Sequence, residues 1–338
     1  MGQFHYKEAF ELESGKKLPG ITVSYHTYGK LNAAKDNVVW VCHALTANSD
    51  VSRWWPGIVG EGKCIDPDKY FIVCANILGS CYGSTGPLSI DPLTGEPFYS
   101  NFPLITIRDM VKAHILLRKH LGIEQIRLLM GGSMGGYQAL EWCVMEKNVV
   151  NELFLIATSC TESAWGIAVH TAQRLAIEAD QSWRDFSPAA GQRGLKAARA
   201  IGILTYRNYG ILAQKQSDPD IEKTDHYKAS SYVNYQGDKL VNRFNAYSYW
   251  LLTKAMDSHH IARGRGIKLE QVLHQIIQRT LIIGIDSDIL CPLNEQRFMA
   301  NYMPHASLIE IDSAYGHDGF MVESDIISKH LLHWMGRD

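Results

Sequence analysis

Six residues near the middle of the chain, Gly131-Gly132-Ser133-Met134-Gly135-Gly136, restrict its fold more than any other segment. An apolar run, Ile126 to Met130, precedes them, and an amphipathic stretch, Tyr137 to Met145, follows. A strand, a glycine-flanked serine and a helix form a nucleophile elbow, a sharp turn that strains the backbone of the serine. Glycines avoid side-chain clashes at such a turn. We therefore predict that Ser133 Oγ projects from the N-terminus of a helix as a nucleophile.

A Gly-x-Ser-x-Gly sequence also occurs in ordinary glycine-rich turns, so the prediction depends on an acid and a base elsewhere. Thr280 to Ile285 is an apolar run typical of a buried parallel strand, and two aspartates follow it. Asp288 lies further past the carboxyl end of that strand, where open α/β sheets collect their active groups, so we favour it as the acid. Asp286 is the alternative, although aspartates often cap turns.

His317 is the candidate base among 14 histidines. Glycines bracket it in Tyr315-Gly316-His317-Asp318-Gly319-Phe320. A short apolar strand, Ser307 to Ile311, precedes this segment, and a helical segment, Val322 to Met335, follows it. The serine, the aspartate and the histidine thus occur in the order that a hydrolase-like α/β fold requires.

A serine hydroxyl is a poor nucleophile at neutral pH and needs a base. We expect His317 to accept its proton and Asp288 to fix the imidazole tautomer. The oxyanion formed by the attack needs two backbone N–H donors, one after the nucleophile and one from an early loop. We expect these donors at Met134 and at Leu45, within His43-Ala44-Leu45-Thr46.

Apolar runs alternate with amphipathic segments along much of the chain. The predicted strands are Ile21 to Tyr25, Val38 to Cys42, Tyr70 to Ala75, Ile126 to Met130, Leu153 to Ala157, Leu281 to Ile285 and Leu308 to Ile311. The alternation predicts an α/β fold, with a mostly parallel sheet and helices such as Ile107 to Leu121 on both faces.

From about residue 164 to residue 278 the strand signal vanishes. The predicted helices there are Val169 to Ala179, Leu195 to Ile203, Arg243 to Met256 and Leu269 to Gln278. We therefore assign residues 1–163 and 279–338 to the core and residues 164–278 to an inserted helical lid. A lid that excludes water favours transfer of an acyl group to another acceptor, although esterases carry lids as well.

Composition narrows the class of protein further. A chain of 338 residues with 46% hydrophobic content can form one large α/β core with an insertion. A net charge of -2 without Lys/Arg runs favours a small-molecule substrate over nucleic acid or membrane. No secretion signal begins the chain and no apolar stretch approaches the ~18 residues of a membrane span, so we expect a cytoplasmic location.

Cysteine and motif content argue against bound metals and cofactors. The seven cysteines form no C-x-x-C pair, which suits reduced thiols rather than disulfides or zinc ligands. The sequence also lacks an H-E-x-x-H metal motif, a P-loop and a dinucleotide-binding fingerprint. We expect no metal and no bound cofactor.

Longer motifs extend over nearly the whole chain. They are His43-Ala44-Leu45-Thr46, Asn76 to Pro87, Phe102 to Val111, the elbow, Gly194 to Arg199, Thr205-Tyr206-Arg207, Ser231-Tyr232 with Tyr235-Gln236-Gly237, and Gly316-His317-Asp318. Together they resemble the homoserine O-acetyltransferase family of α/β-hydrolase acyltransferases. The resemblance implies an α/β-hydrolase core with a helical lid, and a homodimer formed through lid helices. It also implies transfer of an acetyl group from acetyl-CoA to L-homoserine by a ping-pong route through acyl-Ser133, for methionine biosynthesis.

The resemblance assigns three residues to the amino-acid acceptor. Arg199 matches the position that binds the acceptor carboxylate, and a guanidinium suits that planar anion. Tyr206, two helical turns further, could share this task. Asp318 matches the position that holds the acceptor's polar end. Without the resemblance, a lid salt bridge, a packed aromatic ring and a turn aspartate would be the ordinary interpretations of these residues.

Three positions depart from the family pattern. Ala47 stands where glycine is usual, and Asn245 and His260 replace aspartates. Ala47 borders the expected oxyanion loop, so acyl selectivity could differ, whereas the other two would affect acceptor preference or lid packing. A succinyl-CoA donor, an L-serine acceptor, an esterase or thioesterase, and a non-catalytic binding protein remain alternatives.

Overall fold

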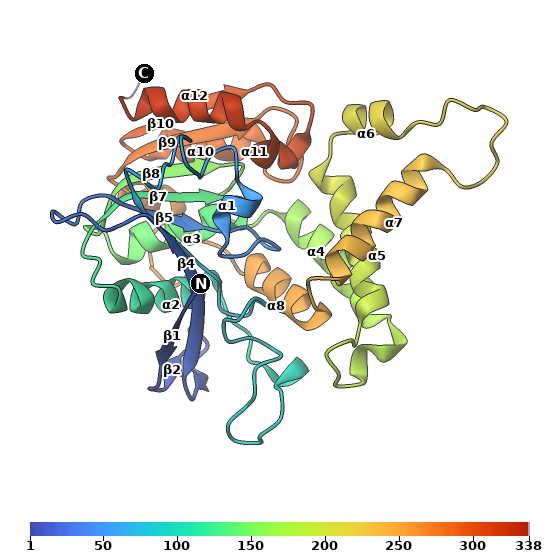
Figure 1. Ribbon diagram of the computed structural model, residues 1–338, viewed down its shortest axis with the longest axis horizontal. Helices are drawn as coiled ribbons and strands as arrows, with labels where there is room; N and C mark the ends of the chain where they lie inside the picture. The colour runs from blue at the N-terminus through green and yellow to red at the C-terminus, as the bar shows by residue number, and fades with distance from the viewer. Residues whose placement is uncertain (337–338) are drawn as a thin grey trace.

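The structure, a computed structural model that describes residues 1–336, centres on an eight-stranded sheet with strand order β1-β4-β6-β5-β7-β8-β9-β10 (Figure 1). The strands from β6 to β10 run parallel to one another, whereas β4 is antiparallel to both β6 and β1. The strands are β1 (Gly2–Tyr6), β4 (Ile21–Tyr28), β5 (Val38–Cys42), β6 (Phe71–Ala75), β7 (Ile126–Gly132), β8 (Val150–Ile156), β9 (Arg279–Ile285) and β10 (Ala306–Ile311). The predicted mostly parallel sheet is confirmed.

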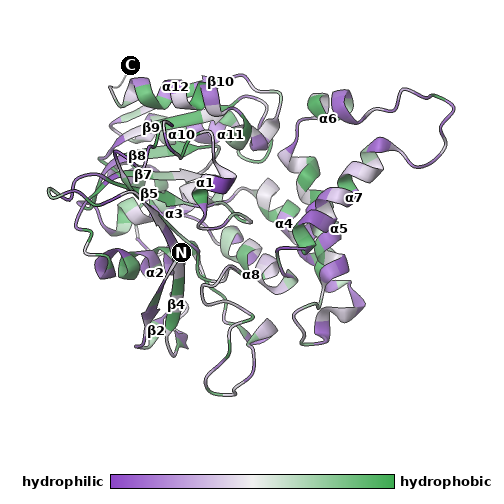
Figure 2. Cartoon of the chain, viewed as in Figure 1, coloured by the Kyte–Doolittle hydropathy of each residue, from purple (hydrophilic) through white to green (hydrophobic). Residues whose placement is uncertain are grey.

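Both faces of the sheet are covered, which explains why its central strands are continuously apolar. Along β5, Val38, Trp40 and Cys42 belong to one apolar cluster, and Val39 and Val41 belong to another. Successive side chains of a strand point to opposite faces, so a strand buried on both faces has no polar positions. Figure 2 shows the resulting hydrophobic colour along these strands.

Two groups of helices form these clusters. The first cluster includes residues of α2 (Ile107–His120), α3 (Met134–Met145), α9 (Leu269–His274) and α10 (Leu293–Tyr302). The second includes residues of α1 (Val51–Trp54), α11 (Gly319–Val322) and α12 (Ser324–Trp334). Helices therefore pack on both faces, as predicted.

Five of the helices between β8 and β9 lie beyond the carboxyl ends of the strands, and residues of this layer such as Ile177, Leu195 and Leu252 belong to the first apolar cluster. They are α4 (Ala164–Glu178), α5 (Gln192–Tyr206), α6 (Tyr209–Gln216), α7 (Lys228–Val241) and α8 (Ala246–Asp257). Helix α4 packs against α5 and α8, and α5 packs against α7. In Figure 1, α4 to α7 lie to one side of the sheet and α8 lies nearer to it. The domain boundaries at residues 164 and 278 stay a prediction.

Several elements were not predicted because they are short or bury few side chains. In β1 the buried residue is Phe4, and the antiparallel pair β2 (Phe10–Glu11) and β3 (Lys17–Leu18) is very short. In α7, Gly237 and Leu240 are the buried residues, and α6 buries Ile211. The predicted closing helix, Val322 to Met335, is confirmed as α12, which begins at Ser324 because Glu323 departs from helical geometry after α11.

Short 3₁₀ turns connect some of these elements: η1 (Tyr99–Asn101), η2 (Gln181–Arg184) and η3 (Gly316–Asp318). Across residues 1–336, each helix is too short or too polar to cross a membrane.

Glu13, in the loop between β2 and β3, ties three distant segments together. Its carboxylate accepts hydrogen bonds from Arg108 Nη1 at 2.5 Å, from Thr106 Oγ1 at 2.7 Å, and from Arg263 Nη1 at 2.8 Å. Arg108 also donates to the buried Glu141 at 2.6 Å. The N-terminal loop, α2, α3 and the segment after α8 thus share one partly buried network of charges.

We predict that Glu13→Gln destabilises the protein by about 1–3 kcal/mol, because two partly buried guanidinium groups lose their charged acceptor. The midpoint and slope of urea unfolding measure this change. Glu11→Gln is the matched control, since its ion pair with Lys17 spans 3.9 Å between exposed side chains and should contribute less than about 1 kcal/mol. Equal effects of the two substitutions would contradict the prediction.

Candidate active site

The elbow holds Ser133 in a conformation that few non-glycine residues adopt, with φ 53° and ψ −131°. Glycines are required on both sides of Ser133, because other backbone segments lie too close for a side chain. A Cβ at Gly135 would lie 2.1 Å from the carbonyl oxygen of Cys42, and one at Gly131 would lie 2.2 Å from that of Gly135. Thr158 Oγ1 donates to the Ser133 carbonyl at 2.7 Å. Helix α3 therefore begins pressed against the end of β5, with the serine side chain at its N-terminus.

The structure brings the three predicted triad residues into one hydrogen-bonded relay. His317 Nε2 lies 2.8 Å from Ser133 Oγ, and His317 Nδ1 lies 2.7 Å from Asp288 Oδ2. All three residues are buried, and they come from the elbow, from the loop after β9 and from η3 after β10. Because β7, β8, β9 and β10 are parallel neighbours, their carboxyl ends bring these segments to one edge of the sheet.

The two competing aspartates have different partners. Asp288 Oδ1 accepts the backbone N–H groups of Leu290 and Cys291 at 2.8 and 2.9 Å, which leaves Oδ2 for the imidazole. Asp286 Oδ1 instead accepts the backbone N–H of Ser313 at 3.1 Å. Asp288 is thus the carboxylate in contact with His317, and Asp286 links the loop after β9 to the loop after β10.

The electrostatic environment of His317 favours proton uptake. Burial alone would lower the pKa of this imidazole, but the charge of Asp288 and its hydrogen bond outweigh burial and raise the pKa above its usual 6.5. An ionised carboxylate on Nδ1 also leaves Nε2 free to exchange a proton with Ser133. The arrangement can therefore perform nucleophilic catalysis with general-base assistance.

The two predicted oxyanion donors are Met134, which follows Ser133 in the chain, and Leu45, and their role stays a prediction. Met134 is the first residue of α3, so its N–H has no acceptor within the helix. Leu45 lines the same pocket as Ser133. Its loop is held by His43, whose Nδ1 contacts the Ala44 carbonyl at 2.9 Å and whose Nε2 accepts the Ile77 N–H at 3.2 Å. Burial lowers the pKa of His43 to about 4, so the ring stays neutral in this role.

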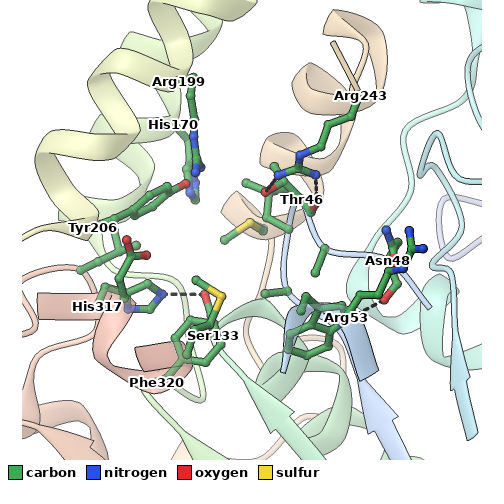
Figure 3. A pocket seen from close by; sticks show the side chains of 18 residues that line it. Thr46, Asn48, Arg53, Ser133, His170, Arg199, Tyr206, Arg243, His317 and Phe320 are labelled. Carbon is green, nitrogen blue, oxygen red and sulfur yellow. Dashed lines mark hydrogen bonds between the residues drawn. The ribbon is translucent and has the colours of Figure 1, made fainter. Parts of the chain in front are cut away.

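A cavity of about 300 Å³ opens above Ser133, between the core and the lid (Figure 3). The residues that line this cavity come from both the core and the lid. They are Ala44 to Asn48, Arg53, Trp54, Ser133, His170, Arg199, Tyr206, Arg243, Met256, Leu290, His317, Asp318, Phe320 and Met321. The cavity lies within the size range of small-molecule sites.

Arg199 and Tyr206 reach this cavity from α5, as predicted. The guanidinium of Arg199 lies over the Tyr206 ring, 5.3 Å from its centroid, and its Nε is buried without a hydrogen-bond acceptor within residues 1–336. No carboxylate in that range forms an ion pair with Arg199. An unpaired guanidinium beside a serine nucleophile is a ready site for an anion.

Asp318 also lines the cavity, but its Oδ2 is 2.9 Å from Arg207 Nε at the end of α5. Burial raises the pKa of Asp318 despite this ion pair. Next to it, Gly316 has φ +66°, and a Cβ there would lie 2.9 Å from the backbone nitrogen of Asn208. The lid therefore contacts the segment that carries the catalytic base.

The three departures from the family pattern differ in position. Ala47 lines the cavity. Asn245 caps α8 by accepting the backbone N–H of Ser248 at 2.8 Å, a role that asparagine and aspartate perform equally well. His260 accepts the Ala262 N–H at 3.1 Å in an exposed turn. Ala47 is therefore the departure placed to touch a substrate.

Asp288, Cys291 and His317 place potential metal ligands within 4.8 Å of one another. They do not suit a metal, because the His317 Nδ1 and Asp288 oxygens already bond to each other and to backbone N–H groups. Burial and the nearby Asp288 charge also raise the pKa of the Cys291 thiol, which disfavours the thiolate that binds metals.

Comparisons with known proteins agree with this geometry. The family model of the alpha/beta hydrolase fold matches residues 37–324. The chain is 49% identical over 320 residues to a homoserine O-acetyltransferase from Cyclobacterium marinum, covering 95% of this chain and 91% of the relative. The chain belongs to the homoserine O-acetyltransferase family.

Solved structures support the same fold. A homoserine O-acetyltransferase from Bacillus anthracis superposes with a TM-score of 0.91 at 25% identity, over 100% of this chain and 97% of the other. Esterase E22 superposes with a TM-score of 0.87 at 22% identity, over 99% of each chain. Since an esterase shares the architecture, the fold alone does not distinguish transfer from hydrolysis.

Sequence reasoning missed several residues at the site. The sequence placed His43 in a motif but predicted no function for it, and it predicted no function for Arg207 or His170. Arg243 bonds the Thr46 carbonyl and donates to the Tyr82 hydroxyl at 2.6 Å, which fixes the other side of the cavity. The position of each of these four side chains depends on a contact with a residue distant in the sequence. Local sequence patterns do not reveal such contacts.

We predict that a fluorophosphonate probe labels Ser133 at a rate that falls as pH decreases through a pKa above 6.5, because protonated His317 cannot accept the serine proton. Asp288→Asn should slow labelling by about 10³–10⁴-fold and move this pH limb downward. Mass spectrometry of the labelled protein across pH measures both effects. Asp286→Asn is the matched control and should label like the parent; an unchanged limb in Asp288→Asn would refute the relay.

Proposed function

We propose that the protein transfers an acetyl group from acetyl-CoA to the hydroxyl of L-homoserine through an acyl-Ser133 intermediate. The observation that carries this proposal is the unpaired guanidinium of Arg199 in the same cavity as a complete Ser133, His317 and Asp288 relay. The relay can form and break an acyl-serine ester, and the guanidinium can bind the carboxylate of an amino-acid acceptor.

In the first half-reaction, Ser133 Oγ attacks the thioester carbonyl while its proton passes to His317 Nε2. The oxyanion is stabilised by the backbone N–H groups of Leu45 and Met134. The carbon–sulfur bond then breaks, and the sulfur leaves as the CoA thiol with the proton from His317. Asp288 stabilises the imidazolium throughout.

In the second half-reaction, the hydroxyl of homoserine donates its proton to His317 Nε2 and attacks the acetyl-serine ester. The same two N–H groups stabilise the second oxyanion. The bond from the acyl carbon to Ser133 Oγ breaks, and the serine regains its proton from His317. The products are O-acetylhomoserine and the free enzyme, which supports a role before the sulfur-incorporating step of methionine synthesis.

The cavity supplies contacts for the acceptor at both polar ends. Arg199 binds the carboxylate, and Tyr206 packs against its guanidinium and lies 6.0 Å from the His317 ring. Asp318 offers a carboxylate oxygen beside the base. The lid helices cover the acyl-serine, so that water competes less well with a bound amino acid.

A thiol-release assay tests the proposal by crossing acetyl-CoA and succinyl-CoA with homoserine, serine and no acceptor. We expect sustained CoA release with acetyl-CoA and homoserine, and a single burst without acceptor, since the acetyl-enzyme then waits. Ser133→Ala should abolish release in every arm. Sustained release without an amino acid would instead identify a thioesterase, and preference for succinyl-CoA or serine would reassign donor or acceptor.

Arg199→Ala should raise the KM for homoserine by about 10–100-fold, because one charge-assisted contact is lost, while the acetylation burst persists. Burst amplitude and steady-state kinetics separate the two effects. Arg193→Ala is the matched control, because Arg193 lies exposed on the same helix. Loss of the burst in Arg199→Ala would reassign this residue to the donor half-reaction.

A further inference from the structure

A second histidine–carboxylate pair lies on the lid side of the same cavity. His170 of α4 is 4% exposed, and its Nδ1 is 2.9 Å from Asp257 Oδ1 at the end of α8. The other oxygen of Asp257 accepts Arg174 Nη2 at 2.6 Å. The relay at Ser133 does not use these residues, and nothing in the proposed acyl transfer so far assigns them a role.

The pair fixes which nitrogen of His170 carries a proton. Burial would raise the pKa of Asp257, but its hydrogen bonds from His170 and Arg174 outweigh burial and lower that pKa. An ionised carboxylate can only accept hydrogen bonds, so the bonded Nδ1 must carry its proton. In the neutral ring Nε2 then presents a lone pair.

His170 lines the cavity, so a substrate bound there could donate a hydrogen bond to this lone pair. Figure 3 shows His170 with Arg199 and Tyr206 on one wall of the cavity, across from Thr46 and Arg243. Helices α4 and α5, which carry His170 and Arg199, pack against each other. Two groups bound to one carbon atom, such as the carboxylate and the ammonium of an amino acid, could reach these neighbouring side chains together.

The remaining charges in the cavity leave an ammonium group short of acceptors. Arg53, Arg199 and Arg243 are cations, and the carboxylate of Asp318 is shared with Arg207. An ammonium has three N–H donors and needs more than one acceptor. His170, whose Nδ1 is held by the partly buried Asp257 carboxylate, offers a further acceptor at Nε2 whenever its ring is neutral.

We propose that His170 binds the α-ammonium group of the acceptor amino acid through Nε2, and that Asp257 is the positioning residue that holds the ring. This assignment rests on the proposed acyl transfer to an amino acid. It gives the lid a specific function in acceptor selection, because Arg199 and His170 together require a carboxylate and an amine on the same carbon.

Truncated acceptors test this assignment. In the parent, homoserine is compared with 4-hydroxybutyrate, which lacks the amine, and with 3-amino-1-propanol, which lacks the carboxylate. His170→Ala should lower kcat/KM for homoserine and for 3-amino-1-propanol by about 10–100-fold, and should leave that for 4-hydroxybutyrate unchanged. The acetylation burst with acetyl-CoA should persist.

Two further variants separate recognition from a structural tie between helices. Asp257→Asn should reproduce the His170→Ala pattern, because its amide can donate to Nδ1 and place the ring proton on Nε2. His170→Gln should restore part of the homoserine kcat/KM, since its amide oxygen reaches the place of Nε2. Glu178→Gln is the matched control, because Glu178 also joins α4 to α8, through Trp250 Nε1 at 2.6 Å. It should leave the kcat/KM for all three acceptors unchanged.

Equal losses for homoserine and 4-hydroxybutyrate, or parent-like homoserine kinetics in His170→Ala, would overturn the assignment while leaving acyl transfer intact. Calorimetric binding of homoserine to Ser133→Ala, with and without His170→Ala, gives an independent measurement, and equal affinities would also overturn it. If the parent neither acetylates nor binds homoserine, the proposed function itself is wrong and this assignment falls with it.

Discussion

The contact between the first turn of α3 and the carboxyl end of β5 is the constraint on which the site depends. Gly135 lies so close to the carbonyl of Cys42 that even a methyl group would overlap it. This approach forces the chain to turn sharply at Ser133, which takes a positive φ and points its hydroxyl away from the sheet. Met134 follows as the first residue of α3, so its N–H has no acceptor within the helix and is the predicted oxyanion donor.

The sheet brings Ser133 into hydrogen-bond contact with His317, which lies 184 residues further along the chain. Parallel strands bring their carboxyl ends to one edge, so loops after β7, β9 and β10 meet although helices and a lid separate them in sequence. Backbone N–H groups then select Asp288 over Asp286, because they occupy one oxygen of Asp288 and aim the other at His317. The backbone therefore determines which carboxylate acts.

The sequence was sufficient for features that local pattern encodes. Buried parallel strands are apolar on both faces, and the elbow needs glycines at fixed positions, so the sheet, Ser133 and the loops that carry Asp288 and His317 could all be predicted. The short, weakly amphipathic α6 could not. Neither could the partners of Glu13 or of His170, because hydrogen bonds over 80 or more residues depend on tertiary packing.

The proposed function assigns the reactive groups to the core and acceptor selection to the lid. Under the proposed function, the core supplies the nucleophile, the base and the oxyanion donors. The lid supplies Arg199, Tyr206 and His170 from two packed helices, and Arg207 links it to the segment of the base through Asp318. Under the proposed function, exchanging lid side chains should therefore change the acceptor without disturbing the relay, since function depends on the site rather than on the fold.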